Sequence, residues 1–196
     1  MKHYFTDNTD LKSEQSQFIF RYHKYDLLFT SDNGVFSKSM IDYGSRVLLD
    51  NIEITNEKTL LDVGCGYGTF GICFNKVYSY LNVDMVDVND RALELAKLNA
   101  KNNNIHANIY KSFIYENVQG SYDVIVTNPP VRAGKEVVTT ILQESIEHLN
   151  ENGSLWVILQ KKQGAPSAKK KMEEVFGNCE IVKRDKGYYL LHSVKR

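Results

Sequence analysis

The stretch LLDVGCGYGTFG, residues 60–71, decides how this chain folds. Its apolar start has the pattern of a buried strand, and the alternating glycines Gly64, Gly66 and Gly68 follow. After them the apolar residues recur at helical spacing. Because glycine lacks a Cβ and tolerates positive φ, a strand–turn–helix of this kind brings backbone close to a bound ligand. The stretch therefore predicts a ligand-binding turn.

The spacing of the glycines separates two classes of ligand, dinucleotides and S-adenosylmethionine. A dinucleotide-binding turn has the pattern G-x-G-x-x-G, and its third glycine would stand where the chain has Thr69. The chain instead has G-x-G-x-G, with an acid, Asp62, shortly before the first glycine. This arrangement resembles motif I of the class I S-adenosylmethionine-dependent methyltransferases, although glycine-rich turns also occur as plain structural bends.

Strand-like and helix-like patterns alternate from residue 59 onward, which predicts a parallel sheet covered by helices on both faces. The expected strands are residues 59–63, 82–87, 107–111, 122–127 and 154–159, and the expected helices are residues 69–77, 90–102, 136–150 and 167–176. Residues 180–183 and 188–194 flank a turn and predict a terminal β-hairpin. The predicted class is thus α/β, with a mostly parallel seven-stranded sheet that ends in an antiparallel hairpin. This arrangement resembles the Rossmann-like fold of the class I methyltransferases, which is the fold we expect.

The first part of the chain has a different pattern. Residues 17–22 and 25–30 predict two short strands, because the aromatic residues of the first alternate with period two. A helix is expected over residues 39–50. We expect residues 1–54 to form a β-hairpin and helix extension packed on a methyltransferase domain of residues 55–196.

Composition excludes several other classes of protein. A chain of 196 residues is most simply one domain, and it has no apolar run near the roughly 20 residues that cross a bilayer. The N-terminus lacks the apolar core of a cleaved signal, so we expect a cytoplasmic protein without membrane contact. Three cysteines without C-x-x-C spacing and five scattered histidines predict no metal site.

The charge of the chain is balanced in total and uneven in distribution. Residues 1–98 carry 10 basic and 14 acidic side chains, a net −4, and residues 99–196 carry 14 and 10, a net +4. A net charge of zero argues against indiscriminate binding to nucleic acid. Composition leaves the oligomeric state open.

Two motifs fall at the carboxyl ends of expected strands, where open α/β sheets bind ligands. Asp87 ends the second strand, and an acid there can accept hydrogen bonds from both hydroxyls of a ribose. The alternative is an ordinary turn acid or a helix cap. Asn128, Pro129 and Pro130 follow the fourth strand. Proline has no N–H and a fixed φ, so this turn is rigid and its carbonyls are expected to point into the cleft.

The Asn-Pro-Pro turn suits a particular reaction. An amine can donate its two hydrogens to the Asn128 side chain and the Pro129 carbonyl, which aims its lone pair at the methyl group of the cofactor. The cofactor already carries a good leaving group, so the protein contributes mainly orientation and exclusion of water. A plain Pro-Pro turn is the alternative explanation.

The motifs together resemble a known family. Asn-Pro-Pro resembles the signature of methyltransferases that act on amino nitrogens: adenine N6, guanine N2 and glutamine amides. The run TNPPVRAGK (127–135), with GVFS (34–37) and the glycine-rich turn, is similar to the small-domain methyltransferases, whose best-known members methylate guanine N2 in small-subunit ribosomal RNA. The resemblance implies Asn128, Pro129 and Pro130 as catalytic residues, and an S-adenosylmethionine site formed by Asp62, Gly64, Cys65, Gly66, Gly68, Asp87, Val88 and Asn128.

The same resemblance suggests where substrate would bind. Val131 stands where many amino-methyltransferases have a stacking Tyr or Phe, and Phe36 is expected to wall the pocket unless it is a core aromatic. Arg132 and Lys135 lie beside the expected site, and Lys161 and Lys162 follow the fifth strand. They predict a basic rim for the phosphates around an extruded base, unless they are ordinary solvated side chains.

The leading hypothesis is a methyltransferase that modifies the N2 amine of a guanine in small-subunit (16S) ribosomal RNA, with ribosomal RNA or the small subunit as partner. Transfer to a protein glutamine amide or to adenine N6 is the alternative within the same chemistry. A non-catalytic cofactor- or RNA-binding module is the alternative of another class, and the intact glycine turn and Asn-Pro-Pro disfavour it.

Overall fold

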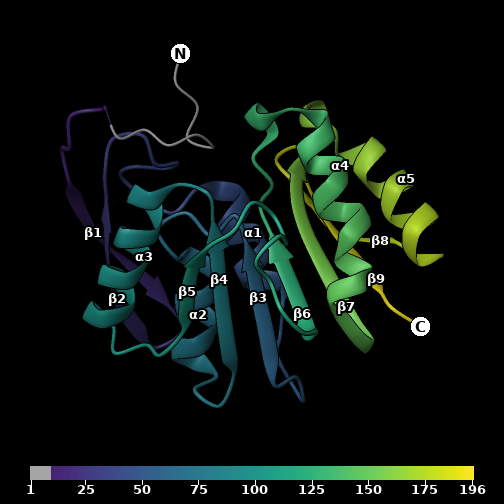
Figure 1. Cartoon of the computed structure of the whole chain (residues 1–196), viewed down its shortest axis with the longest axis horizontal. Helices are drawn as coiled ribbons and strands as arrows, with labels where there is room; N and C mark the ends of the chain where they lie inside the picture. The colour runs from purple at the N-terminus through teal and green to yellow at the C-terminus, as the bar shows by residue number, and fades with distance from the viewer. Residues whose placement is uncertain (1–9) are drawn as a thin grey trace.

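The central sheet has seven strands in the order β5-β4-β3-β6-β7-β9-β8 (Figure 1). This computed structural model describes residues 10–196. The strands are β3 (Thr59–Val63), β4 (Asn82–Asp87), β5 (Asn108–Lys111), β6 (Tyr122–Thr127), β7 (Leu149–Gln160), β8 (Glu180–Asp185) and β9 (Tyr188–Val194). Strands β3 to β7 pair in parallel, and β9 pairs antiparallel with β7 and β8. The expected mostly parallel sheet with a terminal hairpin is confirmed.

Helices cover both faces of this sheet. One face packs against α1 (Tyr43–Asn51), α2 (Thr69–Val77) and α3 (Asp90–Asn102), and the other against α4 (Lys135–Glu144) and α5 (Ala165–Phe176). Successive residues of a strand point to opposite faces, so Leu60 joins the first core and Leu61 the second, both fully buried. Gly71 lets α2 approach the sheet, because a Cβ there would overlap the Met85 side chain of β4.

Several element boundaries differ from the sequence prediction. The helix expected at 136–150 ends at Glu144, a 3₁₀ turn covers Ser145–His148, and β7 already begins at Leu149. Pairing with β6 is interrupted by a bulge between Tyr122 and Val124. Gly153 sits in the bulge, where a Cβ would lie 2.8 Å from the Asn150 carbonyl oxygen. Gly153 therefore marks an irregularity within the strand and not its start.

The helix expected at 39–50 begins later, at Tyr43. Asp42 is its N-cap and accepts a hydrogen bond from the Ser45 backbone N–H at 3.0 Å, which stops the helix from extending toward residue 39.

The N-terminal hairpin forms a sheet of its own. Strands β1 (Ser16–Tyr22) and β2 (Tyr25–Ser31) pair antiparallel, and half-buried residues alternate with exposed ones along β1. Leu27 and Phe29 are fully buried in the same core as Leu60. Residues 1–9 of the expected extension lie outside the described residues, and the domain boundary at residue 54 stays a prediction. None of the helices within residues 10–196 has the length and apolar character needed to span a membrane.

Candidate active site

The glycine-rich turn forms the floor of a cavity at the carboxyl ends of β3 and β4. Gly64, Gly66 and Gly68 have φ values of 73°, 55° and 100°, a region that glycine reaches without strain. The backbone N–H groups of Gly64 and Cys65 both donate to the Val86 carbonyl, at 2.9 and 3.0 Å. The turn is therefore tied to the neighbouring strand, and its residues Gly64, Cys65 and Gly66 line the cavity.

Asp87 lines the same cavity from the end of β4. Its Oδ2 accepts a hydrogen bond from the Gly66 N–H at 2.8 Å, and its Oδ1 accepts one from the Asn89 N–H at 2.9 Å. Burial raises the pKa of this carboxyl, although these N–H donors oppose the shift. Each carboxylate oxygen can accept a further hydrogen bond, so Asp87 fits the ribose-binding role expected from the sequence.

Asp62 lies beneath the turn and is only 1% exposed. Its Oδ2 accepts from the Gly71 N–H at 3.2 Å, while its Oδ1 is buried without a hydrogen-bond partner in the described residues. Burial raises the pKa of this carboxyl to about 8. In this structure Asp62 holds the start of α2 and does not line the cavity, and its contact with a cofactor stays a prediction.

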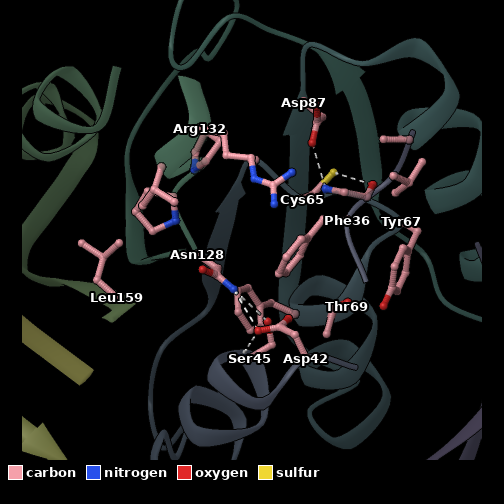
Figure 2. A pocket seen from close by; sticks show the side chains of 18 of the residues that line it. Phe36, Asp42, Ser45, Cys65, Tyr67, Thr69, Asp87, Asn128, Arg132 and Leu159 are labelled. Atoms are coloured by element: carbon pink, nitrogen blue, oxygen red, sulfur yellow. Dashed lines mark hydrogen bonds between the residues drawn. The ribbon is translucent and has the colours of Figure 1, made fainter. Parts of the chain in front are cut away.

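Asn128 is held by the N-terminus of α1. Its Nδ2 donates to Asp42 Oδ2 at 3.3 Å and to Ser45 Oγ at 3.2 Å, and Figure 2 shows the three side chains meeting at one side of the pocket. A carboxylate can only accept, so the amide nitrogen of Asn128 must face Asp42. The amide oxygen Oδ1 is left as an acceptor for a substrate.

The hydrogen bonding of the two proline carbonyls differs from the expectation. These carbonyls are not free: the Pro129 oxygen accepts from the Val131 N–H at 2.9 Å, and the Pro130 oxygen from the Ala133 N–H at 2.8 Å. Pro130 has φ −75° and ψ 81°, the geometry of an inverse γ-turn. A carbonyl oxygen has two lone pairs, so Pro129 keeps one for a substrate amine, and the γ-turn fixes its direction.

The geometry agrees with comparisons against known proteins. The family model of the methyltransferase small domain matches residues 26–192. The chain belongs to this family. Its membership confirms the methyltransferase activity and the S-adenosylmethionine cofactor expected from the sequence. The uncharacterized protein YbxB of Bacillus subtilis is 44% identical over 198 residues, with 99% of this chain and 98% of that protein covered.

Other relatives are longer than this chain. Ribosomal RNA small subunit methyltransferase C of Vibrio cholerae is 29% identical over 190 residues, with 95% of this chain and 55% of that protein covered. The solved structure of the T. thermophilus 16S rRNA N2 G1207 methyltransferase (RsmC), in complex with AdoMet and guanosine, matches with a TM-score of 0.85 at 23% identity and shows the same fold. The match covers 95% of this chain and 52% of that chain. This chain spans about half the length of these two ribosomal RNA methyltransferases.

The cavity brings together most of the residues that the resemblance implied. Of the expected cofactor site it is lined by Gly64, Cys65, Gly66, Asp87 and Asn128. Gly68 instead caps α2, and Val88 lies outside this cavity. Glycines with positive φ, an acid at the ribose position and an open cavity between them fit S-adenosylmethionine.

The expected substrate residues divide between two cavities. Phe36, Val131 and Arg132 line the cofactor cavity together with the two prolines, and Phe36 is 49% exposed, so it is not a core aromatic. Lys135 and Lys162 line a second groove, which also contains Val131 and Arg132. Lys161 is among the lining residues of neither.

Sequence reasoning missed Asp42, Ser45 and Tyr188, which also line the cofactor cavity. The N-cap pattern D-x-x-S at residues 42–45 could have located the start of α1. It could not have shown the contact with Asn128, which joins residues 86 positions apart in the chain.

Proposed function

We propose that this protein transfers a methyl group from S-adenosylmethionine to the exocyclic N2 amine of a guanine in small-subunit (16S) ribosomal RNA. The observation that carries the proposal is that three residues lining the same cavity as the glycine turn offer hydrogen-bond acceptors. We call them the acceptor row: the carboxylate of Asp42, the oxygen Oδ1 of Asn128 and the carbonyl of Pro129. Each can accept a hydrogen bond from the same edge of one planar substrate.

The acceptor row prepares an amine for reaction. Asn128 Oδ1 and the Pro129 carbonyl each accept one hydrogen of the N2 amine, so the nitrogen lone pair is drawn out of conjugation with the ring and toward the cofactor side of the cavity. When bound, S-adenosylmethionine supplies a methyl group on a positively charged sulfur that leaves as a neutral thioether. Transfer would form the nitrogen–carbon bond as the carbon–sulfur bond breaks, and the methylated amine would then release a proton to water.

Asp42 favours guanine among the possible amine substrates. Guanine presents N1–H and N2–H₂ side by side, three donor hydrogens on one edge. Adenine presents its amine next to an unprotonated N1, and a glutamine amide presents its amine next to a carbonyl oxygen. Asp42 Oδ2 is occupied by Asn128 and Ser45, whereas Oδ1 makes no hydrogen bond within residues 10–196 and belongs to a side chain that lines the cavity. A carboxylate oxygen there attracts N1–H and repels the lone pair of the other two substrates.

The relatives support the same substrate class. Several are named ribosomal RNA small subunit methyltransferase C, and the structure of one methyltransferase that acts at guanine N2 was solved with guanosine. Because this chain spans only about half of those proteins, the ribosomal substrate rests on the site as well as on the relatives.

The test uses cofactor labelled in the transferable methyl. The wild type and Asn128→Ala are each offered small ribosomal subunits, stripped ribosomal RNA and total protein from cells that lack the enzyme. We expect label in RNA, recovered as N2-methylguanosine. We also expect Asn128→Ala to lose turnover by at least about a hundredfold while cofactor binding stays largely intact, because the amine loses an orienting acceptor.

Other outcomes overturn the proposal. Label in protein points to a glutamine methyltransferase, and label recovered as N6-methyladenosine to an adenine methyltransferase. Bound cofactor with no label in any fraction favours a binding module. Unchanged turnover in Asn128→Ala removes the mechanism whatever the substrate.

A further inference from the structure

A second groove opens directly beside the cofactor cavity, between α4 and α5. These two helices lie next to each other on one face of the sheet (Figure 1). The groove has a volume of about 610 Å³ and shares Val131, Arg132 and Gln163 with the cofactor cavity. A linear polymer that places one of its units in the cofactor cavity can therefore continue along the protein surface into this groove.

The groove is strongly basic. Five cationic side chains line it: Arg132, Lys135, Lys162, Lys170 and Lys171. The lining includes one carboxylate, Glu174, and this is already paired with Lys171 at 2.8 Å. Within residues 10–196, Arg132, Lys135 and Lys162 form no ion pair. The N-terminus of α5, which begins after Gly164 on the groove wall, adds further positive potential. The groove thus favours an anionic chain.

The floor of the groove determines what it can recognise. Val138, Leu142 and Ala168 form an apolar base, and Thr139 and Ser167 contribute hydroxyls. The residues that line it include no aromatic side chain on which a base could stack. Lysines act on phosphates as point charges and carry no base preference. The groove is therefore suited to a sugar–phosphate backbone and not to reading bases.

We propose that the α4–α5 groove binds the backbone of the RNA segment next to the methylated nucleotide, independently of its sequence. This inference rests on the proposed function, because it takes RNA as the substrate. It extends the basic rim expected from Arg132, Lys135 and Lys162 along α5 to Lys170 and Lys171, so that choice of nucleotide occurs in the cofactor cavity and binding strength comes from the groove.

The experiment compares a groove variant with a matched control. Lys162→Glu/Lys170→Glu reverses two groove charges, and Lys97→Glu/Lys101→Glu reverses two exposed lysines on α3, outside the α4–α5 groove. The probe is a fluorescein-labelled 12-nucleotide RNA of uridines with one central guanosine, titrated by fluorescence anisotropy at several salt concentrations. A Lys162→Gln/Lys170→Gln variant guards against destabilisation of α5 by clustered acids, and thermal unfolding checks each fold.

We expect the groove reversal to raise the Kd for RNA at least about tenfold and to lower the salt slope by roughly one unit per lost contact. The glutamine variant should show a smaller change in the same direction, and the α3 control less than about a threefold change. The groove reversal should raise the Kd by the same factor for a probe in which uridine replaces the guanosine.

Three results would overturn the inference. The first is an equal loss of RNA binding in the groove and α3 variants, and the second is an unchanged salt slope in the groove variant. The third is a groove variant that still binds RNA but no longer binds polyglutamate, which would assign the groove to an acidic protein. Methylation of the same RNA separates this inference from the proposed function. If the wild type methylates RNA and the groove variants bind RNA as well as the wild type does, only the inference about the groove is wrong. If RNA binding depends on the groove but no N2-methylguanosine forms, only the proposed function is wrong.

Discussion

At the scale of single residues, the site depends on which polar groups can donate and which can only accept. Asp42 performs two tasks with one carboxylate. Oδ2 accepts from the Ser45 backbone N–H and from Asn128, which fixes the amide of Asn128, whereas Oδ1 makes no hydrogen bond within residues 10–196 and belongs to a side chain that lines the cavity. Substitution by asparagine separates these tasks, because an amide oxygen can replace Oδ2 while an NH₂ group takes the place of Oδ1.

We predict that Asp42→Asn weakens selection for guanine. On an RNA segment that carries the target guanine or 2-aminopurine in its place, the wild type should prefer guanine at least about tenfold, because only guanine has N1–H, and hydrogen bonds to charged groups contribute about 1.5–3 kcal/mol. The variant should lose most of that preference, because its NH₂ group can donate to the unprotonated N1 of 2-aminopurine. The measurement is kcat/KM for both substrates.

Asp50→Asn, an exposed change on the same helix, serves as the control and should leave the preference unchanged. A ratio of kcat/KM values that does not move in Asp42→Asn would assign to Asp42 only the orientation of Asn128 and the cap of α1.

At the scale of elements, α3 takes the place of a third strand beside the N-terminal hairpin. Asn99 on α3 and Asn103, the C-cap of that helix, stand four residues apart and use their side-chain amides as a strand uses its backbone. Asn99 accepts from the Thr30 N–H at 2.7 Å and donates to the Thr30 carbonyl at 2.9 Å. Asn103 does the same with Leu28, at 3.0 and 2.8 Å. The outer edge of β2 is thereby closed without another strand.

We predict that Asn99→Ala lowers the free energy of unfolding by about 3 kcal/mol, because it leaves buried backbone groups of Thr30 and Tyr67 without partners. Chemical denaturation measures the change, and hydrogen exchange should show faster exchange at the Thr30 amide. Asn102→Ala, an exposed neighbour on the same helix, should change stability by less than about 0.5 kcal/mol. Equal effects of the two substitutions would show that the amide contacts add nothing.

At the scale of the whole molecule, the site lies at the topological switch point of the sheet, between β3 and β6, where the order of the strands reverses. The strands run outward from β3 to β5 on one side and from β6 to β9 and β8 on the other, so the chain leaves β3 and β6 toward opposite faces and a crevice remains between them. The glycine turn follows β3, Asn128 follows β6, and the N-terminal part of the chain closes the crevice with Phe36 and Asp42. Two buried carboxyls, Asp62 and Asp87, lie at this switch point, and the free energy of unfolding depends on their ionisation.

We predict that the free energy of unfolding falls with rising pH because of Asp62. Its pKa is about 8 in the fold and about 4 in an unfolded chain. Between these values the unfolded state releases the proton and the folded state keeps it, so this contribution is fully present below about pH 4 and is lost as the pH approaches 8. The pKa of Asp87 is raised in the same direction.

Thermal unfolding without cofactor, followed from pH 5 to pH 9, should therefore show the Tm of Asp62→Asn rising relative to wild type as the pH increases. Asp26→Asn, at an exposed position on β2, should follow the wild type. Parallel Tm curves for Asp62→Asn and wild type would mean that Asp62 ionises in the fold much as it does in the unfolded chain.

Much of the architecture was determined by local sequence. Alternating strand and helix periods placed the parallel strands, because buried strands and amphipathic helices have different apolar repeats that do not depend on distant contacts. The glycine turn and the Asn-Pro-Pro turn carried their own conformations, since glycine allows positive φ and proline fixes φ. The predicted start of β7 was wrong because tertiary pairing intervened: β6 pairs with residues on both sides of Gly153. The predicted start of α1 was wrong for a local reason, since Asp42 is the N-cap of that helix.

The tertiary structure alone decided how the site is completed. Asp42 and Asn128 are 86 positions apart, and no periodicity or motif in the chain links them. The engaged Pro129 carbonyl likewise depends on a γ-turn whose ψ the sequence left open. The groove between α4 and α5 exists because both helices pack on one face of the sheet, which brings Lys135 and Lys170 to the same surface. Local sequence specifies conformations and residue chemistry, whereas contacts between distant segments follow from packing of the whole chain.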